Sequence, residues 1–162
     1  MKKIVKNTFI LLPIIIIFLI IIPFIISPII NDIRLNRFSK QLNNISLPND
    51  TEFIEMEKAC GKLNGNGNGM DYFACILIKS DLSLDDLNKF YRNQKFKPTK
   101  LFSKNATEID IKRSTGYKLE SDYIENQDIY FDSLKNESDY SKYYIVMIYD
   151  GGYGAGLDLR GN

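Results

Sequence analysis

Residues 51–80 read TEFIEMEKACGKLNGNGNGMDYFACILIKS, and this stretch predicts a β-hairpin. Residues 51–63 and 70–80 flank an Asn-Gly run, residues 64–69, whose members accept positive φ at low cost and favour a tight reversal of the chain. The second arm is apolar at every position from Tyr72 to Ile78, as expected of a central strand that is covered on both faces or is covered by a helix on one face. The fold is therefore expected to be organised around this hairpin.

A helix and further strands follow the hairpin. Ser83 can cap a helix that runs to about Gln94, with Asp85 and Asp86 in its first turn. Later segments predict strands at residues 101–102, 108–112, 117–120, 128–131 and 143–149. This order indicates an α+β fold with a small antiparallel sheet and one covering helix, forming one domain over residues 51–150.

An apolar segment precedes this domain. Residues 8–30 contain no charged side chain and twelve isoleucines. At about 1.5 Å for each helical residue, this segment covers a hydrocarbon core of about 30 Å. It is longer than the apolar part of a signal peptide and lacks a small-residue cleavage site, so we expect an uncleaved, single-pass signal anchor in the cell membrane. Pro13, Pro23 and Pro28 are tolerated in such a helix.

The flanking charges bear on the orientation. They are equal in number on the two sides of the segment: Lys2, Lys3 and Lys6 against Arg34, Arg37 and Lys40. The free amino group, the clustering of lysines in the basic tail of residues 1–7 and the presence of two cysteines favour a cytoplasmic N-terminus and an extracytoplasmic domain. The second charge group belongs either to a solvated stalk or to a basic collar that touches anionic headgroups.

Residues 31–50 are interpreted as a juxtamembrane amphipathic stalk. Leu35, Phe38, Leu42 and Ile45 recur at helical spacing on one face, and Pro48 stops the helix. We expect this stripe to pack on the domain or on a neighbouring copy of the chain, with the membrane surface as the alternative.

Cys60 and Cys75 lie almost symmetrically about the Asn-Gly turn. This placement predicts a cross-strand disulfide, which closes a loop of about 15 residues and contributes roughly 3 kcal/mol. The alternative is two reduced, buried thiols, which fits a cytoplasmic domain better.

Residues 66–74, NGNGMDYFA, resemble one nine-residue unit of the calcium-binding β-roll repeats, with Asn66 in place of the leading glycine. A β-roll shares each ion between successive turns, so one isolated unit does not supply the six to eight oxygen ligands that calcium prefers. The run is interpreted as the hairpin turn, and no metal and no cofactor are predicted.

Residues 151–162, GGYGAGLDLRGN, form a glycine-rich C-terminal tail without the spacing of a phosphate loop or a dinucleotide fingerprint. The tail is either mobile or loosely packed, or it is a loop whose backbone approaches a ligand or a partner strand. Tyr149, Tyr153 and Arg160 are the candidate binding residues. Eight of the ten tyrosines fall in the last 46 residues, where they serve either as strand residues or as a surface for sugars or proteins.

The composition excludes several classes of function. Without histidine, the chain has no Ser-His-Asp or Cys-His nucleophile system and no His-ligated zinc or haem. From residue 31 onward, 18 Lys and Arg stand against 20 Asp and Glu, which disfavours a nucleic-acid partner. The carboxylates Asp85 and Asp86, and those between Asp122 and Asp139, leave open a small carboxylate-dependent hydrolase.

Ile, Lys and Asn make up 55 of the 162 residues, which indicates an AT-rich bacterial genome. We expect a non-enzymatic binding or scaffolding module at the bacterial cell envelope, anchored by residues 8–30, with an envelope protein or a cell-wall glycan as partner. The alternatives are an immunity or sensor subunit that acts through partner membrane proteins, and the small hydrolase. The sequence indicates no particular oligomeric state.

Overall fold

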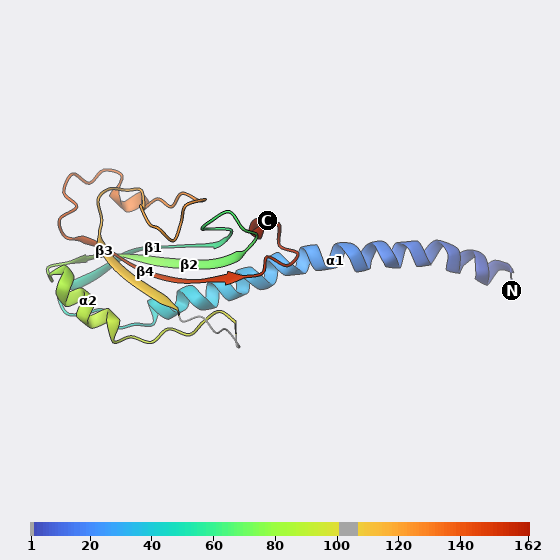
Figure 1. Ribbon diagram of the computed structural model, residues 1–162, viewed down its shortest axis with the longest axis horizontal. Coiled ribbons are helices and arrows are strands. Elements are labelled where there is room, and N and C mark those ends of the chain that lie inside the picture. The colour runs from blue at the N-terminus through green and yellow to red at the C-terminus, as the bar shows by residue number, and fades with distance from the viewer. Residues whose placement is uncertain (1, 101–106) are drawn as a thin grey trace.

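A computed structural model describes residues 2–100 and 107–162 of the chain (Figure 1). In chain order, its elements are α1 (Lys2–Asn43), β1 (Thr51–Gly61), β2 (Met70–Ser80), α2 (Leu84–Arg92), β3 (Glu108–Arg113), the short helix η1 (Asp132–Leu134), β4 (Tyr143–Tyr153) and the short helix η2 (Leu159–Gly161). The strands form one antiparallel sheet in the order β1-β2-β4-β3. The expected α+β fold with a small antiparallel sheet is confirmed.

The central strand β2 carries much of the core, because it is covered on both faces. Every residue of β2 except Lys79 is buried. Alternate side chains such as Ile76 pack on the side of the helices, and those between them, such as Leu77, pack on the opposite side. The prediction of a fully covered strand at residues 72–78 is confirmed.

Two helices cover one face of the sheet, where the sequence predicted one. Leu35, Phe38 and Leu42 of α1 are buried in the same cluster as Leu87 and Tyr91 of α2. Residues 31–43 therefore contribute to the domain core. Of the surfaces expected for this apolar stripe, it packs on the domain. Figure 1 shows α1 lying along the sheet and then extending beyond it as a long rod.

The α1 helix is continuous through Pro13, Pro23 and Pro28. Among the described residues it is the one helix that is long and apolar enough to span a membrane, and the stretch that meets this condition is Ile15–Asn43. Large apolar side chains between residues 12 and 30 are exposed. Because the chain packs on the sheet from Asn31 onward, any membrane crossing has to end near residues 26–30.

The α2 helix begins and ends close to its predicted bounds. The hydroxyl of Ser83 accepts a hydrogen bond from the backbone N–H of Asp86 at 3.2 Å, as a helix cap does. Asp85 and Asp86 occupy the first turn, where carboxylates interact favourably with the helix dipole.

The connection between β3 and β4 covers the other face of the sheet. The strands predicted at residues 117–120 and 128–131 are wrong, because only one isolated bridge joins Lys118 to Tyr130. These segments pack Leu119 and Phe131 onto the sheet face, so they cover the sheet and do not extend it. The strand predicted at residues 101–102 lies outside the described residues.

Cys60 and Cys75 do not form the predicted disulfide. Cys75 pairs with Glu57 across the hairpin, and Cys60 pairs with Tyr72, so the cysteines are three positions out of register. An odd offset places two side chains on opposite faces of a sheet. Cys60 accordingly packs on the helix side and Cys75 on the opposite side, and both thiols are free and buried. The cysteines therefore no longer favour an extracytoplasmic domain.

Candidate functional site

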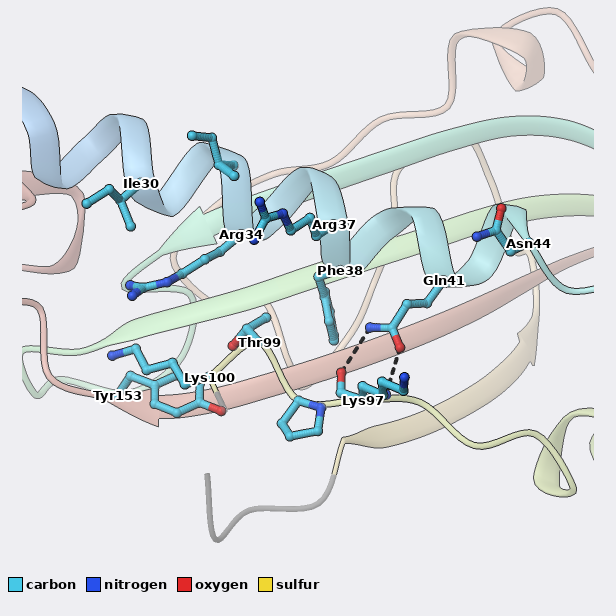
Figure 2. A pocket seen from close by; sticks show the side chains of 12 residues that line it. Ile30, Arg34, Arg37, Phe38, Gln41, Asn44, Lys97, Thr99, Lys100 and Tyr153 are labelled. Atoms are coloured by element: carbon cyan, nitrogen blue, oxygen red, sulfur yellow. Dashed lines mark hydrogen bonds between the residues drawn. The ribbon is translucent and has the colours of Figure 1, made fainter. Parts of the chain in front are cut away.

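An open groove of about 1090 Å³ lies beside the C-terminal part of α1 (Figure 2). One wall is formed by α1 from Ile30 onward and by Asn44, which directly follows the helix. The opposite wall is formed by residues 97–100, which follow α2, and Tyr153 at the end of β4 closes one end. The groove thus begins at the helical turn where the exposed apolar segment meets the domain.

Hydrogen bonds hold the wall of residues 97–100 in place. The side chain of Gln41 bonds both ways with the backbone of Lys97, donating to its carbonyl at 2.9 Å and accepting from its N–H at 2.7 Å. The carboxylate of Asp150 accepts from the backbone N–H and the hydroxyl of Thr99, at 2.5 and 2.6 Å. Because Asp150 is buried, these bonds fix the wall to the end of β4.

Four cationic side chains line the groove, and no carboxylate of the described residues lines it. Arg34 and Arg37 project from α1, and Lys97 and Lys100 come from the opposite wall (Figure 2). None of the four forms a salt bridge within residues 2–100 and 107–162. Such a concentration of unpaired positive charge in a concave surface attracts anions.

Arg34 and Lys100 lie at the end of the groove nearest Ile30. Figure 2 shows both side chains directed toward that end. The Nζ atom of Lys100 lies 4.4 Å from the ring centroid of Tyr153, which favours the ammonium through a cation–π interaction. Burial and then the charge of Arg34 lower the pKa of Lys100, more than the charge of Asp150 raises it. The positive charges of Arg34 and Lys100 are therefore close enough to repel one another.

The groove also has an apolar component. Phe38 is almost completely buried beneath it, whereas the side chains of Ile30 and Ile33 are 40% and 45% exposed. The exposed isoleucines stand beside the cations at the end of the groove that faces the apolar part of α1. A ligand with an anionic group next to an apolar group matches this lining.

The candidate residues Tyr149, Tyr153 and Arg160 do not come together in one site. Tyr153 lines the groove. Tyr149 packs on the opposite face of the sheet, where its ring stacks on Tyr123 with a centroid distance of 4.9 Å. Arg160 lies in the C-terminal segment, outside the groove lining.

The C-terminal segment, residues 151–162, packs against the rest of the domain. It is therefore not the mobile tail that was one of the two expectations from the sequence. The guanidinium of Arg160 donates to the Pro28 carbonyl at 3.1 Å and pairs with Asp32 at 2.7 Å and Asp158 at 2.8 Å. The side chain of Asp158 is only 1% exposed, and the amide of Asn31 donates to it at 2.9 Å. The segment therefore fastens the domain to α1 at the turn where the exposed apolar residues end. Figure 1 places the C-terminus beside α1 at this position.

The carboxylates considered for a hydrolase lie away from the groove. Asp85 and Asp86 are exposed in the first turn of α2, and Asp122 and Asp139 are exposed in the connection between β3 and β4. None of these side chains lines the groove.

Sequence reasoning found one wall of the site and missed the other. Arg34 and Arg37 belong to the charge group that the sequence assigns either to a solvated stalk or to a basic collar, whereas no sequence motif marks Lys97, Thr99 and Lys100 as site residues. A signal was present, because three lysines surround Pro98 within residues 95–100. Nothing in the local pattern, however, indicates that these lysines lie opposite arginines some sixty residues earlier.

Comparisons with protein-family models, curated proteins and solved structures find no match to this chain.

Proposed function

We propose that this protein is a single-pass, membrane-anchored binding module whose groove takes an anionic ligand at the outer surface of a bacterial cell membrane. The observation that carries the proposal is the position of the groove. Its cations Arg34 and Arg37, which form no salt bridge among the described residues, stand about one and two helical turns beyond Ile30, on the same continuous helix as the exposed apolar residues.

The contacts of the C-terminal segment support a fixed placement of the groove. Because Arg160 and Asp158 hold α1 at Pro28 and Asn31, the domain has little freedom to swing away from the membrane. A ligand in the groove would thus be held at a constant height above the bilayer.

The proposal keeps a non-enzymatic role at the cell envelope. Anionic groups on an envelope protein, a wall polymer or a lipid are the ligands that four cations favour. The extracytoplasmic orientation now rests on the clustering of lysines within residues 1–7.

A second candidate function is a sensor or immunity subunit that acts through partner membrane helices. The observation that favours it is the continuity of α1, which forms a groove wall through Arg37 and Gln41 and also carries the apolar segment. Exchange of residues 8–26 for an unrelated apolar helix separates the two candidates. If the protein is a binding module, its activity in the cell survives the exchange. If it is a sensor or immunity subunit, that activity is lost.

Hydrogen exchange of the groove wall tests the proposed function. The full-length protein is placed in nanodiscs of neutral phosphatidylcholine, and exchange of the Lys97 and Thr99 amides is followed by mass spectrometry. Three anionic components are added in turn: inorganic phosphate, a soluble phosphate-bearing wall polymer, and phosphatidylglycerol within the disc. We expect at least one of them to slow exchange, because an occupied groove opens less often.

Matched variants identify the site. Arg37→Gln with Lys97→Gln is expected to abolish the protection. Lys118→Gln with Lys135→Gln removes the same charge from the opposite side of the sheet and is expected to leave the protection unchanged. If none of the three components slows exchange, the proposed function is wrong.

A further inference from the structure

The end of the groove nearest Ile30, called the membrane end below, has positive charge and apolar surface side by side. Arg34 and Lys100 supply two cations there, and neither forms a salt bridge among the described residues. The Arg34 guanidinium donates to the side-chain oxygen of Asn31 at 3.2 Å, and the buried Asp150 is the carboxylate whose charge acts on Lys100. Ile30 and Ile33 supply exposed apolar surface beside them. This is the pattern of a phospholipid, in which a phosphate stands directly above acyl chains.

The height of these residues fits the headgroup layer of a bilayer. The headgroups form a layer of about 5 to 7 Å on each side of the hydrocarbon core. Arg34 follows residues 26–30 by four to eight positions, which is about 6 to 12 Å along the helix axis. Its side chain points back toward Ile30 (Figure 2), so the guanidinium lies lower than its Cα atom.

The opposite wall supplies a cation at the same end. The bonds from Thr99 to the buried Asp150 fix the backbone next to Lys100, and the Tyr153 ring stands under its ammonium. Two cations held by separate elements can contact one phosphate from two directions.

We propose that the membrane end of the groove binds the phosphate of an anionic phospholipid between Arg34 and Lys100, with the upper part of an acyl chain on Ile30 and Ile33. This inference rests on the proposed function, because it names one ligand for the same groove. The lipid would then be a resident component of the groove, drawn from the bilayer that holds α1.

Native mass spectrometry tests the lipid site. The full-length protein is released from nanodiscs that contain equal amounts of phosphatidylglycerol and phosphatidylcholine with identical acyl chains. We expect adducts of phosphatidylglycerol to dominate. Neutralisation by Arg34→Gln or Lys100→Gln is expected to lower the ratio of the two adducts about fivefold for each cation removed. Lys100→Arg keeps the charge and is expected to keep the ratio.

Control variants separate this inference from a general effect of charge. Lys118→Gln with Lys135→Gln is expected to leave the adduct ratio unchanged. Since Lys100 lies in a surface segment, Lys100→Gln gives a result even if Arg34→Gln perturbs the fold. Equal retention of the two lipids, or an unchanged ratio in both groove variants, would overturn the inference.

A free phosphate is the other source of the same chemistry. If inorganic phosphate or the wall polymer slows exchange of the groove wall in neutral discs while phosphatidylglycerol is not retained, the lipid inference is wrong and the proposed function stands. If no anionic component slows exchange and no lipid is retained, both are wrong.

Discussion

Asn31 of α1 and Asp158 of the C-terminal segment form a buried side-chain hydrogen bond of 2.9 Å, although 127 positions separate them in the sequence. The carbonyl oxygen of the same Asn31 amide accepts a hydrogen bond from the hydroxyl of Tyr72 in β2 at 2.7 Å. One side chain therefore joins the long helix, the central strand and the end of the chain. This junction fixes the position of the groove relative to the apolar part of α1.

Removal of this junction is expected to destabilise the domain. Asn31→Ala leaves the Asp158 carboxylate and the Tyr72 hydroxyl buried without this partner, which costs about 1–3 kcal/mol for each such group. Asn43→Ala, at an exposed position near the end of α1, is the matched control and is expected to change stability little. Denaturant unfolding of the full-length protein in nanodiscs measures both variants, and equal stabilities would contradict the role of Asn31.

The stability of the protein is expected to fall at acid pH through Asp158. The hydrogen bonds from Arg160, and to a lesser degree that from Asn31, lower the pKa of Asp158 from 3.8 to about 2. Since the ionised carboxylate is favoured in the folded state, its contribution is complete above about pH 4 and is lost as the pH falls toward about 2. Asp158→Asn removes this contribution.

Unfolding free energies measured between pH 2 and pH 6 check this prediction. The difference between the wild type and Asp158→Asn is expected to be largest at the upper end of this range and to shrink below about pH 4. A difference that stays constant across the range would show that Asp158 is not stabilised as an anion.

Gly61 is expected to tolerate no side chain, because the C-terminal segment docks against it. Its φ of +148° favours glycine, and a Cβ atom there would lie 2.8 Å from the carbonyl oxygen of Arg160. The same oxygen accepts the N–H of Lys62 at 2.7 Å. Gly61→Ala is therefore expected to lower the free energy of unfolding by about 1–3 kcal/mol and to speed exchange of the Lys62 amide. Gly67→Ala, where a Cβ would meet nothing within 4 Å, is the control. The same effect in both variants would contradict the docking.

The two cysteines are expected to be reduced and slow to react in the folded protein. Burial raises the pKa of Cys60 to about 11 and raises the pKa of Cys75 as well, so little thiolate forms near neutral pH. Denatured protein that has met no reductant should contain two titratable thiols, and added reductant should not change the melting temperature. A loss of thiols with a faster band on a non-reducing gel would indicate the disulfide after all.

The hairpin, α2 and the central strand were predictable because their signals are local. The Asn-Gly run, the Ser83 cap and the uniform apolarity of residues 72–78 act over a few neighbouring positions. The register of the hairpin was not predictable in the same way. Glu57 pairs with Cys75 and Cys60 pairs with Tyr72 in one unbroken register, so the turn sets which face each cysteine occupies. The bulge between Phe53 and Glu55 lies beyond both cysteines and changes only the pairing at the open end of the hairpin.

Residues 31–50 and the groove show the limits of local patterns. The spacing of Leu35, Phe38 and Leu42 predicts a helix with one apolar face but does not identify the surface that this face covers. The groove depends on Lys97 and Lys100 lying opposite α1, which follows from the Gln41 and Asp150 hydrogen bonds and not from any motif. The C-terminal segment is glycine-rich, and its close packing also comes from contacts with distant residues.

The most direct test of the account is the side of the membrane on which the domain lies. A single cysteine is introduced at Glu120, which is exposed in the connection between β3 and β4, and another, in a separate chain, at Lys3 in the basic tail. Intact cells are treated with a membrane-impermeant maleimide, and the wild type, whose cysteines are buried, supplies the background. The account predicts labelling of Glu120→Cys in intact cells and of Lys3→Cys only after lysis. Labelling of Lys3→Cys in intact cells, with Glu120→Cys protected until lysis, would contradict it.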